Sequence, residues 1–217
     1  LGDVYKRQVR KLPVDLEMIV VDDGSTDGTR EKLLQLQATD EELIVCFQGT
    51  NQGKGAALQA GFSRCCGDVV IVQDADLEYD PSDILNVIRP IVEGNCEVVY
   101  GSRYLDHERH NDQSWIHRMG NGFLTGLSNL CTGQRLTDME TAYKAFRREL
   151  IQSINIEQPR FGFEPEITAK LSARRITIHE VPISYRPRSY DEGKKIGWRD
   201  LISTLYCILR YRFGKSS

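Results

Sequence analysis

The sequence has no long apolar run, no secretion signal and no paired cysteine motif. None of its apolar stretches approaches the roughly 18 residues that a transmembrane helix requires. A positively charged leader with an apolar segment and a small-residue cleavage site is also absent. The six cysteines form no Cys-x-x-Cys pair and no zinc-finger spacing, which excludes the common structural zinc sites. We therefore expect the reduced thiols of a cytosolic protein.

The charge is nearly balanced overall but unevenly distributed along the 217 residues, a length typical of one domain. Lys and Arg number 28 against 31 Asp and Glu, for a formal net charge of −3. Residues 174–217 hold ten Lys and Arg against four Asp and Glu, so this part is basic and the remainder acidic. A basic segment of this kind suits phosphate or an anionic membrane surface. Nucleic acid is not expected as a partner, because no recognised binding motif or aromatic stacking platform is present.

An apolar run at 18–21 leads directly into the acidic, glycine-bearing segment 22–29. Such a run is typical of a parallel strand covered on both faces. Asp22 and Asp23 follow it, at the strand end where open α/β sheets bind ligands. Asp27 is predicted to cap the next helix, with Gly28 allowing a tight turn.

A second apolar strand, predicted at 68–73, also ends in carboxylates. In an extended segment, alternation places Asp74, Asp76 and Glu78 on one side, within reach of one cation. Carboxylate oxygens suit Mg²⁺ or Mn²⁺, which usually keep open positions for phosphate. The pattern predicts a divalent metal site made by these three residues.

Strand and helix patterns alternate, which predicts an α/β fold with a mainly parallel sheet flanked by helices. Strands are expected at 17–21, 43–47, 68–73, 97–101, 141–147 and 176–184. Helices are expected at 27–37, 52–64, 81–93, 115–131, 164–173 and 197–211. An apolar stripe in the last helix, formed by Leu201, Leu205, Ile208 and Leu209, suits either a membrane interface or packing on the sheet.

Four motifs occur in a fixed order and together resemble a known family. They are Asp-Asp-Gly-Ser-Thr-Asp-Gly-Thr at 22–29, Asp-Ala-Asp-Leu-Glu at 74–78, Gly-Ser-Arg-Tyr at 101–104 and Phe-Gly-Phe-Glu at 161–164. On these motifs the chain is similar to family 2 glycosyltransferases of the GT-A fold. Within that family it looks like the dolichyl-phosphate mannose synthase-like, polyprenyl-phosphate glycosyltransferase group.

The resemblance implies one GT-A domain over 16–213, with a tail at 214–217. Members of the family normally begin with an apolar strand and a helix before the Asp-Asp-Gly-Ser strand. Residues 1–15 match only a leader and a remnant of that helix. We therefore expect the first strand of the fold to be missing.

The resemblance also assigns a donor side of the site. Asp22 and Asp23 are expected to contact the base and ribose of a nucleotide sugar, and the basic segment 185–198 to close over its diphosphate. A divalent ion at Asp74, Asp76 and Glu78 would neutralise the leaving group. The expected nucleotide-sugar-binding residues are Asp22, Asp23, Ser25, Asp27, Lys54, Asp74 and Lys195.

On the acceptor side, the resemblance assigns Arg103 and Arg118 to the phosphate of a lipid acceptor. An arginine fork suits a phosphate because it is planar and permanently charged. Asp138 is expected to act as base or to orient the sugar, with Glu140 as the second choice. The expected catalytic residues are thus Asp76, Asp138 and Arg103.

The function implied is an inverting, metal-dependent transfer of a hexose from a nucleotide sugar to a polyprenyl phosphate. The hexose would be mannose or glucose, the donor GDP- or UDP-linked, and the lipid dolichyl or undecaprenyl phosphate. The enzyme would be cytoplasmic and peripheral at the cytoplasmic face of the membrane. Three alternatives remain: a family 2 enzyme with a saccharide acceptor, a sugar-phosphate nucleotidyltransferase, and a truncated fragment that binds nucleotide or membrane without turnover.

Overall fold

The computed structural model describes residues 12–40, 42–76, 78–106, 115–160, 162–187 and 198–213. The leader expected at 1–15 and the missing first strand concern mainly residues 1–11. The expected tail comprises residues 214–217. These residues lie outside the described part of the chain, so both expectations stay predictions.

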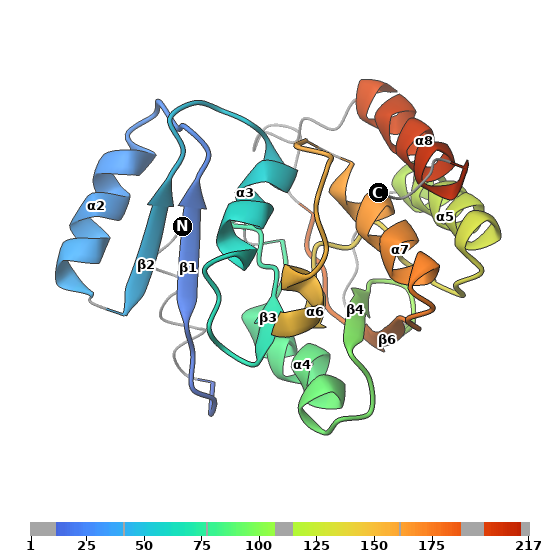
Figure 1. Cartoon of the computed structure of the whole chain (residues 1–217), viewed down its shortest axis with the longest axis horizontal. Helices are drawn as coiled ribbons and strands as arrows, with labels where there is room; N and C mark the ends of the chain where they lie inside the picture. Colours follow the sequence, from blue (N-terminus) through green and yellow to red (C-terminus); the bar gives the residue numbers. More distant parts are fainter. Residues whose placement is uncertain are drawn as a thin grey trace.

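The strands of the described residues form two sheets (Figure 1). In the first, β1 (Met18–Asp22) pairs in parallel with β2 (Leu43–Phe47). The second has the order β3-β5-β4-β6 and comprises β3 (Val69–Ile71), β4 (Val98–Ser102), β5 (Lys144–Arg147) and β6 (His179–Pro182). Strand β5 pairs antiparallel with both β3 and β4, whereas β4 and β6 are parallel. Among the described strands of this sheet, only β5 runs against the others. The structure thus confirms the predicted α/β class with mainly parallel strands.

Helices cover both sheets. They are α2 (Thr29–Thr39), α3 (Lys54–Phe62), α4 (Ile84–Val92, after a 3₁₀ turn at Pro81–Asp83), α5 (Trp115–Thr132), α6 (Arg148–Gln152), α7 (Phe163–Ala173) and α8 (Trp198–Phe213). Helix α2 lies against β2 and α3 against β1, while α5, α7 and α8 pack on one another at the other end of the molecule (Figure 1).

The larger sheet is buried on both faces. Side chains alternate along a strand, so Val98 and Tyr100 of β4 pack with residues of α5, α7 and α8, whereas Val99 packs against α4. All three are fully buried. This double coverage explains why three apolar residues follow one another at the start of β4 without polar alternation.

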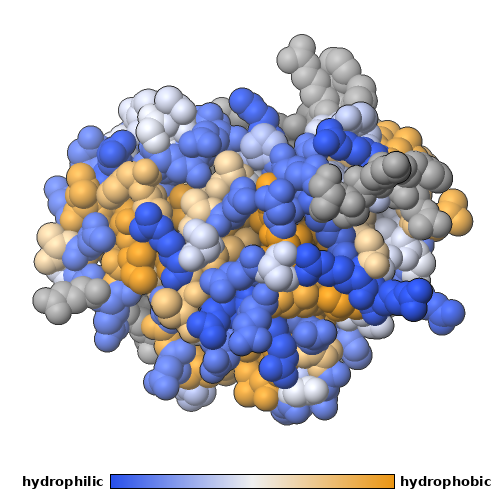
Figure 2. Space-filling view, in the orientation of Figure 1, coloured by the Kyte–Doolittle hydropathy of each residue, from blue (hydrophilic) through white to orange (hydrophobic). Residues whose placement is uncertain are grey.

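Two residues of the apolar stripe predicted in the last helix join this core, and the side chain of Leu201 lies outside the described part. Ile208 is buried and Leu205 packs against the same cluster, while Leu209 is exposed. In the described residues, no helix combines the length and apolarity that crossing a bilayer requires. Figure 2 shows a face on which hydrophilic side chains predominate. Hydrophobic side chains lie on the left and in the centre of this view, and some lie at the right-hand edge, where α5 and α8 are found.

Most elements lie where the sequence predicts them, with the larger differences at strand ends. Strand β3 ends at Ile71 rather than at residue 73, and β5 begins at Lys144 rather than at residue 141. The short helix α6 was not predicted. The chain turns at Ala75 and Asp76, so the extended segment expected to carry three carboxylates does not form.

Candidate functional site

The end of β1 presents one buried carboxylate with an unpartnered oxygen. Asp22 is 3% exposed, and its Oδ1 accepts a hydrogen bond from the Ser25 amide at 3.3 Å. Its Oδ2 is enclosed and has no hydrogen-bond partner among the described residues. Buried polar atoms are nearly always hydrogen-bonded, so this oxygen is available to a ligand.

The neighbouring Asp23 holds the loop before α3. Its two carboxylate oxygens accept hydrogen bonds from the amides of Gln52 and Gly53, both at 2.7 Å. Asp23 therefore connects β1 to the start of α3, and a nucleotide contact by Asp23 would add to this structural role.

The predicted cap of α2 is displaced by one residue. The capping position is Gly28, in the left-handed conformation at φ 87°, and it supplies no side-chain hydrogen bond. The Asp27 carboxylate instead accepts from the Thr29 amide at 3.1 Å. Hydrogen bonds from Thr29 lower the pKa of Asp27. The exposed Asp27 thus orders the turn from just outside the helix, and the prediction that it is the cap is wrong by one position.

Lys54, expected to contact nucleotide or phosphate, bridges two carboxylates. Its Nζ lies 3.0 Å from Asp74 Oδ2 and 2.9 Å from Glu164 Oε1. Burial opposes the charged form of Lys54, but the two carboxylates outweigh it and raise the lysine pKa. The bridge joins the start of α3, the loop after β3 and the first turn of α7. Sequence reasoning missed Glu164 as a partner because 110 residues separate it from Lys54.

The three carboxylates predicted to hold a metal point to different partners. Asp74 pairs with Lys54, Asp76 Oδ1 accepts from the Glu78 amide at 3.1 Å, and Glu78 Oε2 accepts from the Tyr185 hydroxyl at 2.8 Å. Across the described ranges, no group of three His, Cys, Asp or Glu side chains is placed to hold a metal ion. The three side chains do not converge because the chain turns at residues 75–76. The turn ends the extended backbone in which every second side chain would point to the same side.

A metal shared with a ligand fits these residues better than a three-carboxylate cage does. Mg²⁺ commonly binds through one or two carboxylates and completes its shell with water and substrate phosphates. Asp74 and Asp76 supply hard oxygen donors two residues apart in the loop after β3. They are therefore the residues that could hold such an ion.

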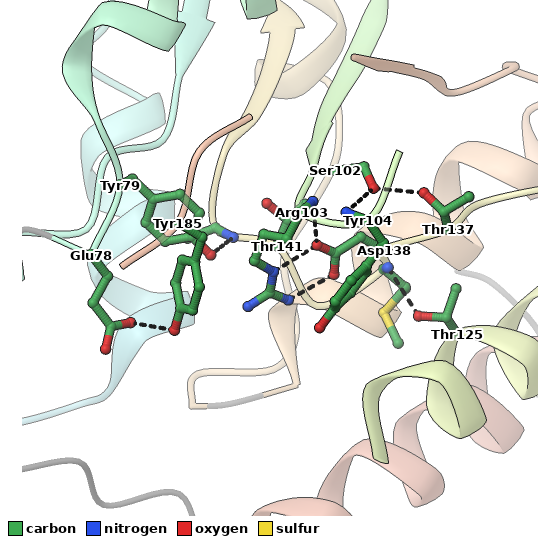
Figure 3. Close-up of polar contacts among 12 residues, drawn as sticks. Glu78, Tyr79, Ser102, Arg103, Tyr104, Thr125, Thr137, Asp138, Thr141 and Tyr185 are labelled. Atoms are coloured by element: carbon green, nitrogen blue, oxygen red, sulfur yellow. Dashed lines mark hydrogen bonds and ion pairs between the residues drawn. The ribbon is translucent and has the colours of Figure 1, made fainter. Parts of the chain in front are cut away.

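Arg103 and Asp138 form a buried, two-pronged ion pair (Figure 3). Arg103 Nε and Nη2 lie 2.6 and 2.7 Å from the two Asp138 oxygens, and the Arg103 amide donates to Asp138 Oδ2 at 3.1 Å. Asp138 is fully buried and Arg103 is 8% exposed. Burial opposes the charge on Arg103, but Asp138 raises its pKa well above the usual value. The geometry makes Asp138 the residue that positions Arg103. Its expected role as base or sugar-orienting group stays a prediction.

Two arginines predicted to bind one phosphate lie at the same tyrosine. The guanidinium carbons of Arg103 and Arg118 are 5.6 and 5.5 Å from the centre of the Tyr104 ring. Both distances suit cation–π contact. Arg118, on α5, is exposed. The structure thus brings together the two residues assigned to the acceptor, although Arg103 is mostly covered by its pairing.

Tyr185 links this pair to the loop after β3, a role that the sequence did not reveal. The Arg103 guanidinium lies 5.0 Å from the Tyr185 ring centre, and Tyr185 also contacts Tyr79 edge-on. Its hydroxyl donates to Glu78 (Figure 3). Lys195 and most of the segment predicted to close over the donor lie outside the described residues.

Comparison with known proteins assigns the chain to a family. Residues 5–154 match the model of glycosyl transferase family 2. The chain is 31% identical over 205 residues to undecaprenyl-phosphate 4-deoxy-4-formamido-L-arabinose transferase of Proteus mirabilis, covering 94% of this chain and 60% of that protein. The protein of the same name from Aeromonas hydrophila is 31% identical, with 92% and 58% covered. The chain thus spans about three fifths of these relatives.

Solved structures with little sequence identity share the fold. Glucosyl-3-phosphoglycerate synthase of Mycobacterium tuberculosis superposes with a TM-score of 0.69 at 21% identity, covering 99% of this chain and 75% of that one. Mannosyl-3-phosphoglycerate synthase of Rubrobacter xylanophilus gives 0.66 at 20% identity, with 97% and 67% covered. These likenesses confirm the GT-A fold. By its family model and its relatives, the chain belongs to glycosyl transferase family 2.

Proposed function

We propose that this chain is the catalytic domain of an inverting glycosyltransferase that moves a sugar from a nucleotide sugar to a polyprenyl phosphate. The observation that carries the proposal is that Arg103 and Arg118 both lie at the Tyr104 ring. Arg118 belongs to α5, which also has an exposed apolar face. The undecaprenyl-phosphate transferases among its relatives support the acceptor class. A single displacement by the acceptor phosphate oxygen would break the bond from the anomeric carbon to the diphosphate.

On the donor side, we propose that Asp22 contacts the nucleoside through its unpartnered Oδ2. Asp74 and Asp76 would hold a divalent ion together with the diphosphate, and Lys54 adds a positive charge beside them. Such an ion, when bound, would neutralise the charge that develops on the leaving diphosphate. A structural relative that has been solved with Mn²⁺ and uridine diphosphate is consistent with this arrangement.

On the acceptor side, the phosphate is already an anion, so its oxygen needs positioning more than deprotonation. Arg118 would bind it directly. Arg103, oriented by Asp138, would contribute a fixed positive charge nearby. Because the acceptor oxygen is already charged, the Arg103–Asp138 pair does not have to supply a general base.

The exposed face of α5 suits a membrane surface. Trp115, Met119 and Phe123 expose 68%, 65% and 63% of their surface, and their spacing of four residues places them on one side of the helix. Arg118 lies among them. Apolar side chains beside a cation are typical of helices that lie in the interface of an anionic bilayer. We therefore propose that this face meets the membrane that carries the lipid acceptor.

Replacing Arg118 by alanine tests the acceptor site without disturbing the core. We expect the acceptor KM to rise about tenfold, the loss typical of one charge-assisted hydrogen bond. Stability and donor binding should stay close to wild type, because Arg118 is exposed. The matched control is Arg135→Ala, another exposed arginine. An unchanged acceptor KM in Arg118→Ala, or an equal rise in the control, would contradict the assignment.

Replacing Trp115, Met119 and Phe123 together by serine tests the membrane face. Binding to phosphatidylglycerol vesicles should fall roughly a hundredfold, because burial of each side chain contributes about 1 kcal/mol or more. Vesicle flotation measures the change. The control replaces Leu34 and Val92, exposed apolar residues of α2 and α4, and should bind as wild type does. Equal losses in both proteins would show that general hydrophobicity, not this face, controls binding.

A further inference from the structure

Glu180 of β6 holds the loop that leads from α5 into β5. Glu180 lies opposite Tyr100 in the parallel pairing of β6 with β4. Its Oε2 accepts hydrogen bonds from the Thr137 amide at 2.8 Å and from the Thr137 hydroxyl at 3.0 Å. Its Oε1 accepts from the Asp138 amide at 3.0 Å. Both carboxylate oxygens are therefore engaged, and their donors are uncharged groups of this one loop.

The Thr137 hydroxyl extends this contact to the backbone of Tyr104. Since its one hydrogen is donated to Glu180, Thr137 Oγ1 must accept in its 2.6 Å contact with Ser102 Oγ. Ser102 Oγ in turn accepts from the Tyr104 amide at 3.1 Å (Figure 3). The donors thus point one way, from the Tyr104 amide through two hydroxyls to the carboxylate. Hydrogen bonds in such a chain polarise and strengthen one another.

The other carboxylate oxygen leads to Arg103. Glu180 Oε1 fixes the amide of Asp138. The Asp138 carboxylate holds the Arg103 amide at 3.1 Å and the guanidinium at 2.6 and 2.7 Å (Figure 3). A shift of the loop backbone at residue 138 would therefore move the guanidinium. Glu180 reaches Arg103 and Tyr104 by two separate routes.

Both routes end where the acceptor-side charges lie. The guanidinium carbons of Arg103 and Arg118 are 5.6 and 5.5 Å from the centre of the Tyr104 ring. In enzymes, a displacement of about 1 Å in a positioning group can cost about a hundredfold in rate. A side chain that fixes both Arg103 and Tyr104 can thus control acceptor use without touching the acceptor.

We propose that Glu180 is a positioning residue for the polyprenyl phosphate, because it fixes Arg103 and Tyr104. It acts on the first through Asp138 and on the second through the hydroxyl chain. The inference rests on the proposed function and adds a residue outside the contact shell of the substrates. A glutamine could not replace Glu180, because its NH₂ group would face an N–H or O–H donor of the loop.

The test measures initial rates of Glu180→Gln and Thr137→Val against the concentration of undecaprenyl phosphate. The donor is whichever UDP- or GDP-linked sugar wild type uses best. Glu180→Gln should raise the acceptor KM about tenfold, and Thr137→Val, which breaks only the Tyr104 route, about threefold. Thr137→Ser retains the hydroxyl and should show the wild-type acceptor KM. The donor KM should stay unchanged in all variants, because the described contacts of Asp22 and Lys54 do not involve these side chains.

The matched control is Glu17→Gln, at the start of β1. Glu17 is half-buried, as Glu180 is, and accepts from the amides of Cys66 and Gly67 at 2.8 and 3.3 Å. Its replacement should lower the melting temperature but leave the acceptor KM unchanged. A general loss of stability reduces the amount of folded enzyme and hence the apparent kcat. It does not change the acceptor KM of the molecules that remain folded.

Amide hydrogen exchange gives a second readout, which does not depend on transfer. Exchange at the amides of Tyr104 and Asp138 should become about tenfold faster in Glu180→Gln and should not change in Glu17→Gln. If wild type transfers sugar to undecaprenyl phosphate and Glu180→Gln has the acceptor KM of the control, this inference is wrong and the proposed function stands. Equal rises in the acceptor and donor KM, or unchanged exchange at both amides, would also overturn it. If wild type transfers no sugar to a polyprenyl phosphate, the proposed function falls, and this inference falls with it.

Discussion

Replacing Arg103 by alanine should destabilise the fold by about 3–5 kcal/mol, the usual cost of removing one partner of a buried ion pair. Asp138 is fully buried, and both of its oxygens are hydrogen-bonded to the Arg103 side chain. Without the arginine, its charge would remain in the core without compensation. A domain of this length should lose roughly 6–20 °C of melting temperature. Urea denaturation and a thermal melt measure both quantities.

Two further variants separate this effect from a general loss of packing. Arg103→Lys retains the charge but not the planar fork, so it should be less destabilised. Removing both partners, in Arg103→Ala with Asp138→Ala, should cost less than the sum of the single losses, because no unpaired charge remains. A wild-type melting temperature for Arg103→Ala, with acceptor use lost, would instead favour the sequence-based assignment of Arg103 mainly to the acceptor phosphate.

Replacing Asp76 by alanine should abolish sugar transfer while the fold survives. Asp76 is partly exposed in the turn after β3, so its removal leaves no uncompensated charge in the core. Loss of the ion on the leaving diphosphate should cost several kcal/mol of the barrier, or about a thousandfold in rate. Initial rates measure the loss of transfer, and calorimetry with and without Mn²⁺ measures nucleoside diphosphate binding.

The matched control for this variant is Asp68→Ala, an exposed aspartate just before β3, which should behave as wild type. Unchanged metal-dependent binding in Asp76→Ala would show that the metal site is wrongly placed. Loss of transfer in both variants, with equal loss of melting temperature, would indicate a stability effect rather than a metal site.

The sequence predicted most of the fold because its local signals agree with the tertiary structure. The buried strand Leu43–Phe47 is a continuous apolar run, and the prediction matches the structure at both ends. Errors arise where local and tertiary preferences differ. The sequence favours extension through residue 73, but the chain leaves the sheet at Ile71 and turns two residues before Glu78. Helix α6 is too short to show a periodic pattern.

The sequence named candidate site residues but did not reveal how their side chains pair with one another. Arg103 and Asp138 were each assigned to substrate, and the structure pairs them with each other across 35 residues. Lys54 was assigned to phosphate and bridges Asp74 to Glu164. A charged residue in a motif indicates that a partner is needed, but a single sequence does not distinguish a ligand from a distant side chain.

Transfer assays with different acceptors test the central claim most directly. The domain is incubated with UDP- and GDP-linked sugars, Mn²⁺ or Mg²⁺, and either a polyprenyl phosphate, a soluble phosphate monoester or a sugar with free hydroxyls. We predict a sugar-linked polyprenyl phosphate as the product, formed with inversion at the anomeric carbon and lost on chelation of the metal. Efficient transfer to a sugar hydroxyl or to the soluble phosphate, with none to the polyprenyl phosphate, would contradict the proposed function.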